Sequence, residues 1–158
     1  MNGIRLLLIT GITLFSSLLP QLWHKDLSSV FIDNSSSSVR ISDKESLCDE
    51  NLIITLKYYG LDNTDIILAQ AKLETGNYSS RICREYNNIF GLYDSKNHDY
   101  YRFTSWKECV LFYKIKIYSR YDRKSDYLSF LDNIGYAEDM DYTSKIKEII
   151  ENESYYRD

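Results

Sequence analysis

The chain of 158 residues is long enough for one compact domain and too short for two of ordinary size. Hydrophobic residues make up 44% of it and charged residues 27%, a balance that is typical of globular proteins and excludes intrinsic disorder. A net charge of −4 leaves no basic surface of the kind that binds nucleic acid, so we expect no nucleic-acid partner.

The N-terminal segment has the pattern of a targeting sequence. Arg5 precedes an uncharged and mostly apolar run over 6–23. Its length lies between that of a signal-peptide core and that of a membrane anchor, and we keep both alternatives. The serine-rich stretch 24–42 is typical of a linker. The sequence therefore predicts an exported protein, periplasmic or extracellular, that is either released or held by an N-terminal membrane anchor, with a folded domain over 43–158.

Two helices are predicted at the start of this domain. Ser42 and Glu45 have the spacing of a capping box, which opens the first helix. Gly60 ends that helix, because glycine readily adopts the left-handed backbone of a helix terminus. The second helix begins at an Asn-Thr pair and spans 63–76, with apolar residues at helical spacing.

A loop is predicted over 77–88, followed by a hairpin and three further helices. The β-prone runs 89–93 and 100–103 flank a polar turn over 94–99. A second capping box, Ser105 with Glu108, begins the third helix. Ser125 or Asp126 caps the fourth, and Asp141 caps the last. The predicted fold class is α+β and mostly α, with five helices and one small hairpin.

Glu74 is singled out by its place at the end of the second helix. It lies about 80° from Ile66 around the helix axis, at the edge of the apolar stripe, so its carboxyl should be half buried. The negative end of the helix dipole also disfavours an anion there. Both effects raise the pKa of a glutamate, as a general acid requires near neutral pH. The alternative, from position alone, is an ordinary charged residue at a helix end.

Several motifs surround Glu74 and follow it along the chain: Ala69-Gln70-Ala71, Leu73-Glu74-Thr75-Gly76, Asn87-Asn88-Ile89-Phe90-Gly91, Tyr101-Arg102-Phe103 and Tyr136-Ala137-x-Asp139-x-x-Tyr142. Together they resemble the glucosaminidase family of lysozyme-like peptidoglycan hydrolases. This resemblance implies a lysozyme-like fold, with a helical body, a small β-hairpin lobe and a cleft between them. It also implies hydrolysis of a β-1,4 bond in peptidoglycan, after N-acetylglucosamine.

The resemblance also implies roles for individual residues. Glu74 matches the catalytic acid, and Tyr142 matches a tyrosine near it that hydrogen-bonds substrate or water. Gln70, one helical turn before Glu74, is expected to hydrogen-bond near the acid or to be a surface amide. The residues expected to contact substrate are Gln70, Tyr78, Asn88 and Phe90; for the last three, the alternative is packing or support of the scaffold.

A second carboxylate is expected in the β-lobe, because glycosidases usually pair their acid with a base or a nucleophile. The hairpin contains Asp94 and Asp99. We prefer Asp99, which adjoins the second strand, since Asp94 is suited to starting the turn. Alternatively, the N-acetyl group of the substrate acts as an internal nucleophile and no second carboxylate is needed.

The expected partner is therefore the glycan strand of peptidoglycan. The alternatives are a lysozyme-like muramidase, a lytic transglycosylase and a non-catalytic glycan-binding module. The 15 tyrosines suit either a sugar cleft or the packing of a helical domain. No cluster has metal-ligand spacing, so no cofactor is expected, and Cys48, Cys83 and Cys109 signal neither a zinc site nor a disulfide framework. No feature indicates an oligomer, and we expect a monomer.

Overall fold

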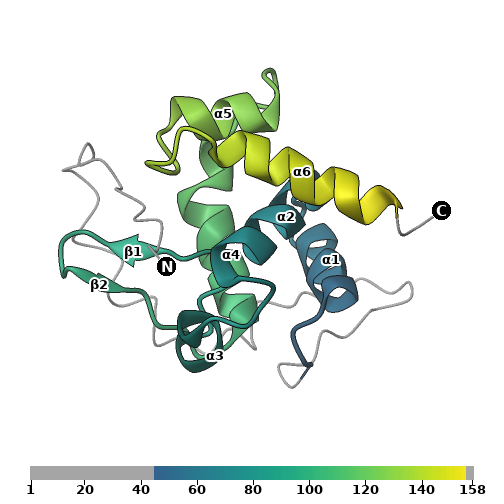
Figure 1. The fold of residues 1–158 in the computed structure, drawn as a ribbon. Coiled ribbons are helices and arrows are strands. Elements are labelled where there is room, and N and C mark those ends of the chain that lie inside the picture. Colours follow the sequence, from purple (N-terminus) through teal and green to yellow (C-terminus); the bar gives the residue numbers. More distant parts are fainter. Residues whose placement is uncertain (1–44, 156–158) are drawn as a thin grey trace, which may run out of the picture. The chain divides into compact units, whose positions relative to one another are not determined.

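The computed structural model describes residues 45–155. These residues form six α-helices, a short 3-10 helix and one two-stranded sheet (Figure 1), which confirms the α+β, mostly α class. The predicted signal peptide or anchor (1–23) and linker (24–42) lie outside them. In the part of the chain that is described, no helix has both the length and the apolar character needed to span a bilayer.

Helices α1 (Asp49–Tyr58) and α2 (Thr64–Thr75) pack against each other. The predicted start of the first helix is wrong, because residues 45–48 are not helical. The carboxylate of Glu45 instead binds the ammonium of Lys107 at 2.9 Å, and its carbonyl accepts a hydrogen bond from Trp106 Nε1 at 3.0 Å. These contacts hold the segment against the start of the fourth helix, so tertiary contacts override the capping box.

Helix α3 (Arg81–Tyr86) lies inside the segment 77–88, where the sequence predicted a loop. The Ser80 hydroxyl accepts a hydrogen bond from the amide of Cys83 at 3.1 Å and caps its start. Asn87 ends it in the left-handed backbone conformation, at φ +52°. With six residues, α3 is too short to show an apolar periodicity, which is why the pattern missed it. The three cysteines at 48, 83 and 109 are unbridged.

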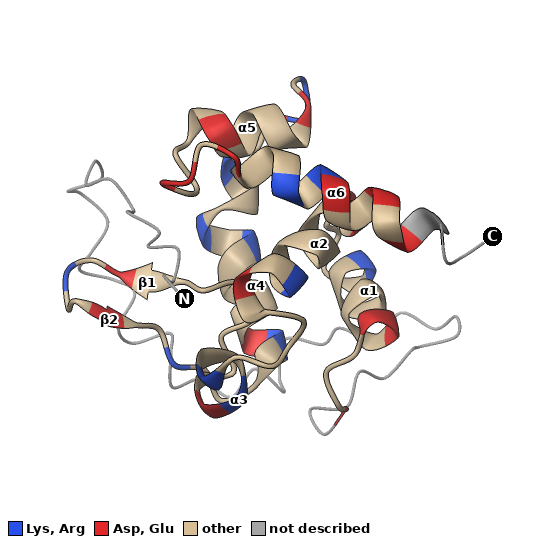
Figure 2. Cartoon of the chain, viewed as in Figure 1, with Lys and Arg blue, Asp and Glu red and all other residues tan. Residues whose placement is uncertain are grey.

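Strands β1 (Tyr93–Asp94) and β2 (Asp99–Tyr100) form the predicted hairpin, but each has only two residues. They pair antiparallel, with Tyr93 opposite Tyr100 and Asp94 opposite Asp99. Ile89, the first residue of the first apolar run, lies outside the strand and is 0% exposed in the core. Acidic side chains lie on both strands (Figure 2).

The remaining elements are α4 (Trp106–Lys116), the 3-10 helix η2 (Tyr118–Arg120), α5 (Tyr127–Asn133) and α6 (Tyr142–Tyr155). Ser105 caps α4 by accepting a hydrogen bond from the amide of Glu108 at 3.3 Å, and Asp126 caps α5 through the amide of Ser129 at 3.0 Å. Both predicted helix starts are thereby confirmed. Helix α6 packs along α2, which brings the end of the domain against its beginning.

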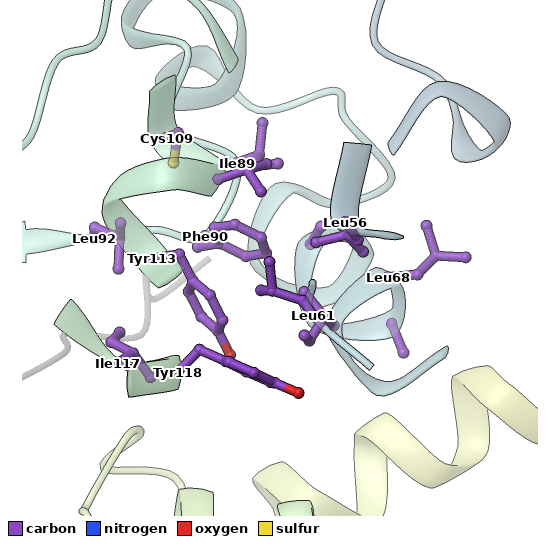
Figure 3. Close-up of a cluster of buried hydrophobic side chains, with 14 of the residues drawn as sticks. Leu56, Leu61, Leu68, Ile89, Phe90, Leu92, Cys109, Tyr113, Ile117 and Tyr118 are labelled. Atoms are coloured by element: carbon purple, nitrogen blue, oxygen red, sulfur yellow. The ribbon is translucent and has the colours of Figure 1, made fainter. Parts of the chain in front are cut away.

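The core lies where α2, α4 and the 88–92 loop meet, and the Phe90 ring packs tilted against the Tyr113 ring at a centroid distance of 4.3 Å (Figure 3). Much of the tyrosine excess is found in this interior: the tyrosines that are 9% exposed or less are Tyr86, Tyr113, Tyr118, Tyr127, Tyr136 and Tyr142. The rings of these residues pack in the interior. A phenol hydroxyl that leaves water needs a hydrogen-bond partner, so these tyrosines must also form polar contacts inside the core.

Candidate active site

Glu74 lies in the last turn of α2 and is half buried, as its position predicted. The next residue, Thr75, is buried; its hydroxyl donates to the carbonyl of Ala71 at 2.6 Å and accepts from the amide of Tyr78 at 2.8 Å. Gly76 then ends the helix at φ +56°. The Thr-Gly pair thus fixes the end of the helix that carries the carboxyl.

Of the residues predicted near the acid, Tyr142 contacts it directly and Gln70 contacts Tyr142. The hydroxyl of Tyr142, the first residue of α6, donates to Glu74 Oε1 at 3.0 Å. Gln70 Nε2 donates to the hydroxyl of Tyr142 at 3.1 Å. The Gln70 side chain is 0% exposed, so it is not a surface amide.

The loop after α3 reaches the other oxygen of the carboxyl. Gly91 has φ +60°, and a Cβ atom at this position would lie 2.8 Å from Glu74 Oε2. Glycine adopts this backbone conformation without strain and leaves the carboxyl where it lies. The final glycine of the Asn-Asn-Ile-Phe-Gly motif therefore lies against the carboxyl.

Asn88 holds this loop in place. Its Nδ2 donates to the carbonyls of Leu92 at 2.8 Å and Tyr101 at 3.0 Å, and its Oδ1 accepts from the amide of Leu92 at 2.9 Å. The side chains of Asn88 and Phe90 are each 1% exposed. They leave no surface for a sugar, and the structure favours the scaffold and core alternatives for both.

Burial raises the pKa of Glu74 to about 8, although the hydrogen bond from Tyr142 acts in the opposite direction. Among residues 45–155 no Lys, Arg or His forms an ion pair with this carboxyl that would favour its charged form. The acid is therefore mostly protonated at neutral pH.

The two hairpin carboxylates have other partners. Asp94 accepts hydrogen bonds from the amide of Lys96 at 3.0 Å and from Asn97 Nδ2 at 2.7 Å, which closes the turn. Asp99 is exposed; it accepts from the amide of Tyr100 at 2.8 Å and forms an ion pair with Arg102 at 3.2 Å. The Tyr100 amide, together with Arg102, lowers the pKa of Asp99. Neither aspartate is hydrogen-bonded to the acid or to the residues that contact it.

Tyr78 lies just after α2, and its hydroxyl donates to Asp49 Oδ1 at 3.0 Å. Its backbone is left-handed, with φ +64°, which is uncommon for an aromatic residue. Two hydrogen bonds support this conformation, one from its backbone amide to the Thr75 hydroxyl and one from its own hydroxyl to Asp49. The contacts tie α1 to the end of α2. They favour the packing alternative, while sugar stacking on the ring remains a prediction.

Sequence reasoning missed two residues that connect to the acid. The hydroxyl of Tyr113 in α4 donates to Gln70 Oε1 at 2.8 Å, and it lies 2.7 Å from the hydroxyl of Tyr127 in α5. The available signal was the tyrosine excess, since buried phenols must find polar partners, but a single sequence does not tell which.

Among residues 45–155, no group of three or more His, Cys, Asp and Glu side chains has the arrangement of a metal site. A surface pocket of about 710 Å³ lies between the α1–α2 turn and the end of α4, and contains none of the predicted site residues; it is lined by Tyr59, Gly60, Lys114, Ile115, Tyr118, Ser119, Tyr121 and Arg123.

Comparison with known proteins agrees with the resemblance seen in the sequence. Residues 50–155 match the family Glucosaminidase, described as mannosyl-glycoprotein endo-beta-N-acetylglucosaminidase. No curated protein and no solved structure gives a significant match. The matched segment includes every motif around Glu74 and spans most of the chain, so the protein belongs to the glucosaminidase family of glycoside hydrolases.

Proposed function

We propose that the protein hydrolyses the β-1,4 bond that follows N-acetylglucosamine in peptidoglycan, with Glu74 as the general acid. The observation that carries this proposal is a half-buried carboxyl at the end of α2 whose pKa is raised to about 8. Such a group holds a proton at neutral pH and can deliver it. Family membership supports a glycan as the substrate.

In this reaction Glu74 protonates the glycosidic oxygen as the bond to the anomeric carbon breaks and its electron pair moves to that oxygen. A water molecule then adds to the anomeric carbon and loses its proton to a base. Tyr142 holds the carboxyl through Oε1 while the bond breaks. General acid catalysis of this kind contributes about 100- to 10,000-fold to the rate.

For the base we propose Asp99, because its lowered pKa keeps it ionised at neutral pH. Its ion pair with Arg102 would have to open or move aside as substrate binds. If the substrate's own N-acetyl group acts instead, Asp99→Asn and Asp94→Asn should both retain most of the activity. A loss of activity in Asp99→Asn alone would support the paired-carboxylate mechanism.

The proposal is tested by reducing-end analysis of purified peptidoglycan incubated with the protein or with Glu74→Gln. We expect new N-acetylglucosamine ends from the unaltered protein and a loss of about 100- to 10,000-fold in the variant. The rate should also fall as the pH rises above about 8, where Glu74 loses its proton. Absence of cleavage by the folded protein would favour the glycan-binding alternative.

A second candidate is lytic transglycosylation, which a single glutamate can perform. The observation that favours it is the engagement of Asp94 and Asp99 in the hairpin's own hydrogen bonds and ion pair. Mass spectrometry separates the two reactions, because transglycosylation leaves anhydro-muramic ends and the proposed hydrolysis leaves reducing N-acetylglucosamine ends.

A further inference from the structure

Five side chains from four helices form a continuous hydrogen-bonded chain that ends at the acid. It runs from Tyr127 (α5) to Tyr113 (α4) at 2.7 Å, to Gln70 (α2) at 2.8 Å, to Tyr142 (α6) at 3.1 Å and to Glu74 Oε1 at 3.0 Å. The first four side chains are each 2% exposed or less. Because they are shielded from water, each hydroxyl and amide must be satisfied by its neighbours.

The direction in which hydrogens are donated along this hydrogen-bond chain is determined at Tyr127, the end farthest from the acid. A phenol has a single hydrogen to donate. The 2.7 Å distance between the Tyr113 and Tyr127 hydroxyls fits either one as the donor. We infer that Tyr127 donates, because within residues 45–155 the Tyr113 hydroxyl is its hydrogen-bond partner and a buried phenol hydrogen needs an acceptor. The hydrogen of Tyr113 must then go to Gln70 Oε1, because a hydroxyl that accepts from Tyr127 keeps its own hydrogen for the next acceptor.

The same argument continues to the carboxyl. With its oxygen facing Tyr113, Gln70 turns its amide nitrogen toward Tyr142 and donates to the phenol. Tyr142 therefore accepts from Gln70 and donates to Glu74 Oε1. Every donor in the chain points toward the acid, so Oε1 can only accept.

We propose that this hydrogen-bond chain confines the catalytic proton to Oε2 of Glu74, the oxygen beside Gly91, and that Gln70, Tyr113 and Tyr127 act as positioning residues. The inference rests on the proposed role of Glu74 as the acid. Oε1 faces an O–H group, so a proton on the neutral carboxyl occupies the other oxygen. That oxygen lies against the glycine, where a side chain would intrude.

Among residues 45–155, no charged side chain forms an ion pair with Glu74 that would compete in placing the proton. The titratable groups that face Glu74 from other elements are the phenols of Tyr142 in α6 and Tyr136 in the α5–α6 loop. Burial raises the pKa of both phenols well above their ordinary value, so they remain neutral. The orientation of hydrogen-bond donors then decides which carboxyl oxygen is protonated.

Loss of the Tyr113 hydroxyl should free the Gln70 side-chain amide to change its orientation. In Tyr113→Phe, Gln70 has no partner on that side, and its amide can rotate so that Oε1 faces Tyr142. Tyr142 would then donate to Gln70, and the proton of Glu74 would move to Oε1, away from the glycine. We expect kcat to fall at least about tenfold with KM changed less than about twofold, since the Tyr113 side chain is 0% exposed and does not contact substrate.

The matched control is Tyr118→Phe. Tyr118 is also a buried tyrosine, 5% exposed, but its hydroxyl accepts from the amide of Asp62 at 2.9 Å and donates to Asn63 Oδ1 at 3.2 Å, outside the chain. Both variants lose one buried hydroxyl and should lose similar stability. Only Tyr113→Phe should change kcat and raise the pKa of Glu74, because only there does the carboxyl lose the hydrogen bond from Tyr142.

The pKa of Glu74 is measured by NMR of its labelled carboxyl carbon, which does not depend on turnover. If the unaltered protein cuts no glycan, the proposed function fails while the NMR comparison still tests the chain. If it cuts glycan but Tyr113→Phe matches Tyr118→Phe in kcat and in the pKa of Glu74, the inference is overturned and the acid keeps its role. Should Tyr113→Phe not fold, Tyr127→Phe provides the same comparison, with a smaller effect of the same sign.

Discussion

At the scale of single residues, Gly91 is the position where an added atom would affect the acid most directly. In Gly91→Ala the new Cβ would lie 2.8 Å from Glu74 Oε2, so the carboxyl at the end of its flexible side chain must move. Displacement of a catalytic group by about 1 Å can cost about 100-fold in rate. We expect a loss of that order in kcat for glycan cleavage, measured by release of reducing ends.

The control for this change is Gly135→Ala. Gly135 has nearly the same backbone, φ +62° against +60° for Gly91, but has no atom within 4 Å of the added Cβ. Both variants should lose about 1 to 2 kcal/mol of stability from the left-handed conformation. If Gly135→Ala loses as much activity as Gly91→Ala, backbone strain and not contact with the carboxyl is the cause.

The candidate site was predictable only in part at this scale. The helix-end position and the motifs identified Glu74, and the contact of Gln70 and Tyr142 near it was expected. Tyr113, which donates to Gln70 Oε1, and Tyr127, whose hydroxyl contacts that of Tyr113, were not expected. They lie 43 and 57 residues from Gln70, in α4 and α5, and no spacing rule links such positions. Long-range polar contacts depend on how the helices pack, which one sequence does not specify.

At the scale of secondary structure, local capping chemistry predicted the starts of α4 and α5. The caps at Ser105 and Asp126 work as expected because a short polar side chain satisfies a free amide in the first turn. The same reasoning failed for α1, where Glu45 makes contacts with α4 that replace the predicted capping box. It also missed α3, whose cap, Ser80, lies in a segment without apolar periodicity.

Lys72 connects three helices and offers a test at this scale. Its ammonium lies on α2 and pairs with Asp49 of α1 and Glu153 of α6. The Lys72 side chain is 13% exposed, so the pairs are partly shielded from water. Lys72→Met removes the cation and leaves the carboxylates of Asp49 and Glu153 without this partner. We therefore expect a loss of about 1 to 2 kcal/mol in the free energy of unfolding, measured in urea.

Lys145→Met is the comparison for that measurement. Lys145 pairs with Asp139 and is 46% exposed, so its loss should cost less than about 1 kcal/mol. The deficit of Lys72→Met should also shrink at high salt, as screening weakens the repulsion between the remaining carboxylates. Equal losses in the two variants would show that the three-helix contact adds nothing beyond a surface ion pair.

At the scale of the whole domain, buried phenols predict a limit to stability at alkaline pH. Burial raises the pKa of Tyr113, Tyr136 and Tyr142 well above the ordinary value for tyrosine. The folded state therefore keeps protons that the unfolded chain releases near about pH 10. Below that pH the phenols contribute their full stability, and above it the free energy of unfolding falls by about 1.4 kcal/mol per pH unit for each of them.

Urea unfolding between about pH 8 and about pH 11 checks this expectation. The midpoint should hold steady up to about pH 10 and then drop steeply, with tyrosinate absorbance from these phenols rising together with unfolding. Ionisation of all the tyrosines near about pH 10 in a protein that stays folded would contradict the burial of these side chains.

The packing of α2 against α6 also determines when, during synthesis, the protein can become active. Glu74 and the Tyr142 hydroxyl that contacts it are 68 positions apart in the chain. A growing chain that ends after α5 already contains the carboxyl but lacks its donor, and the same holds for a fragment from which proteolysis has removed α6. Activity should therefore arise only when α6 has been made and has docked, so the reaction itself reports that the domain is complete.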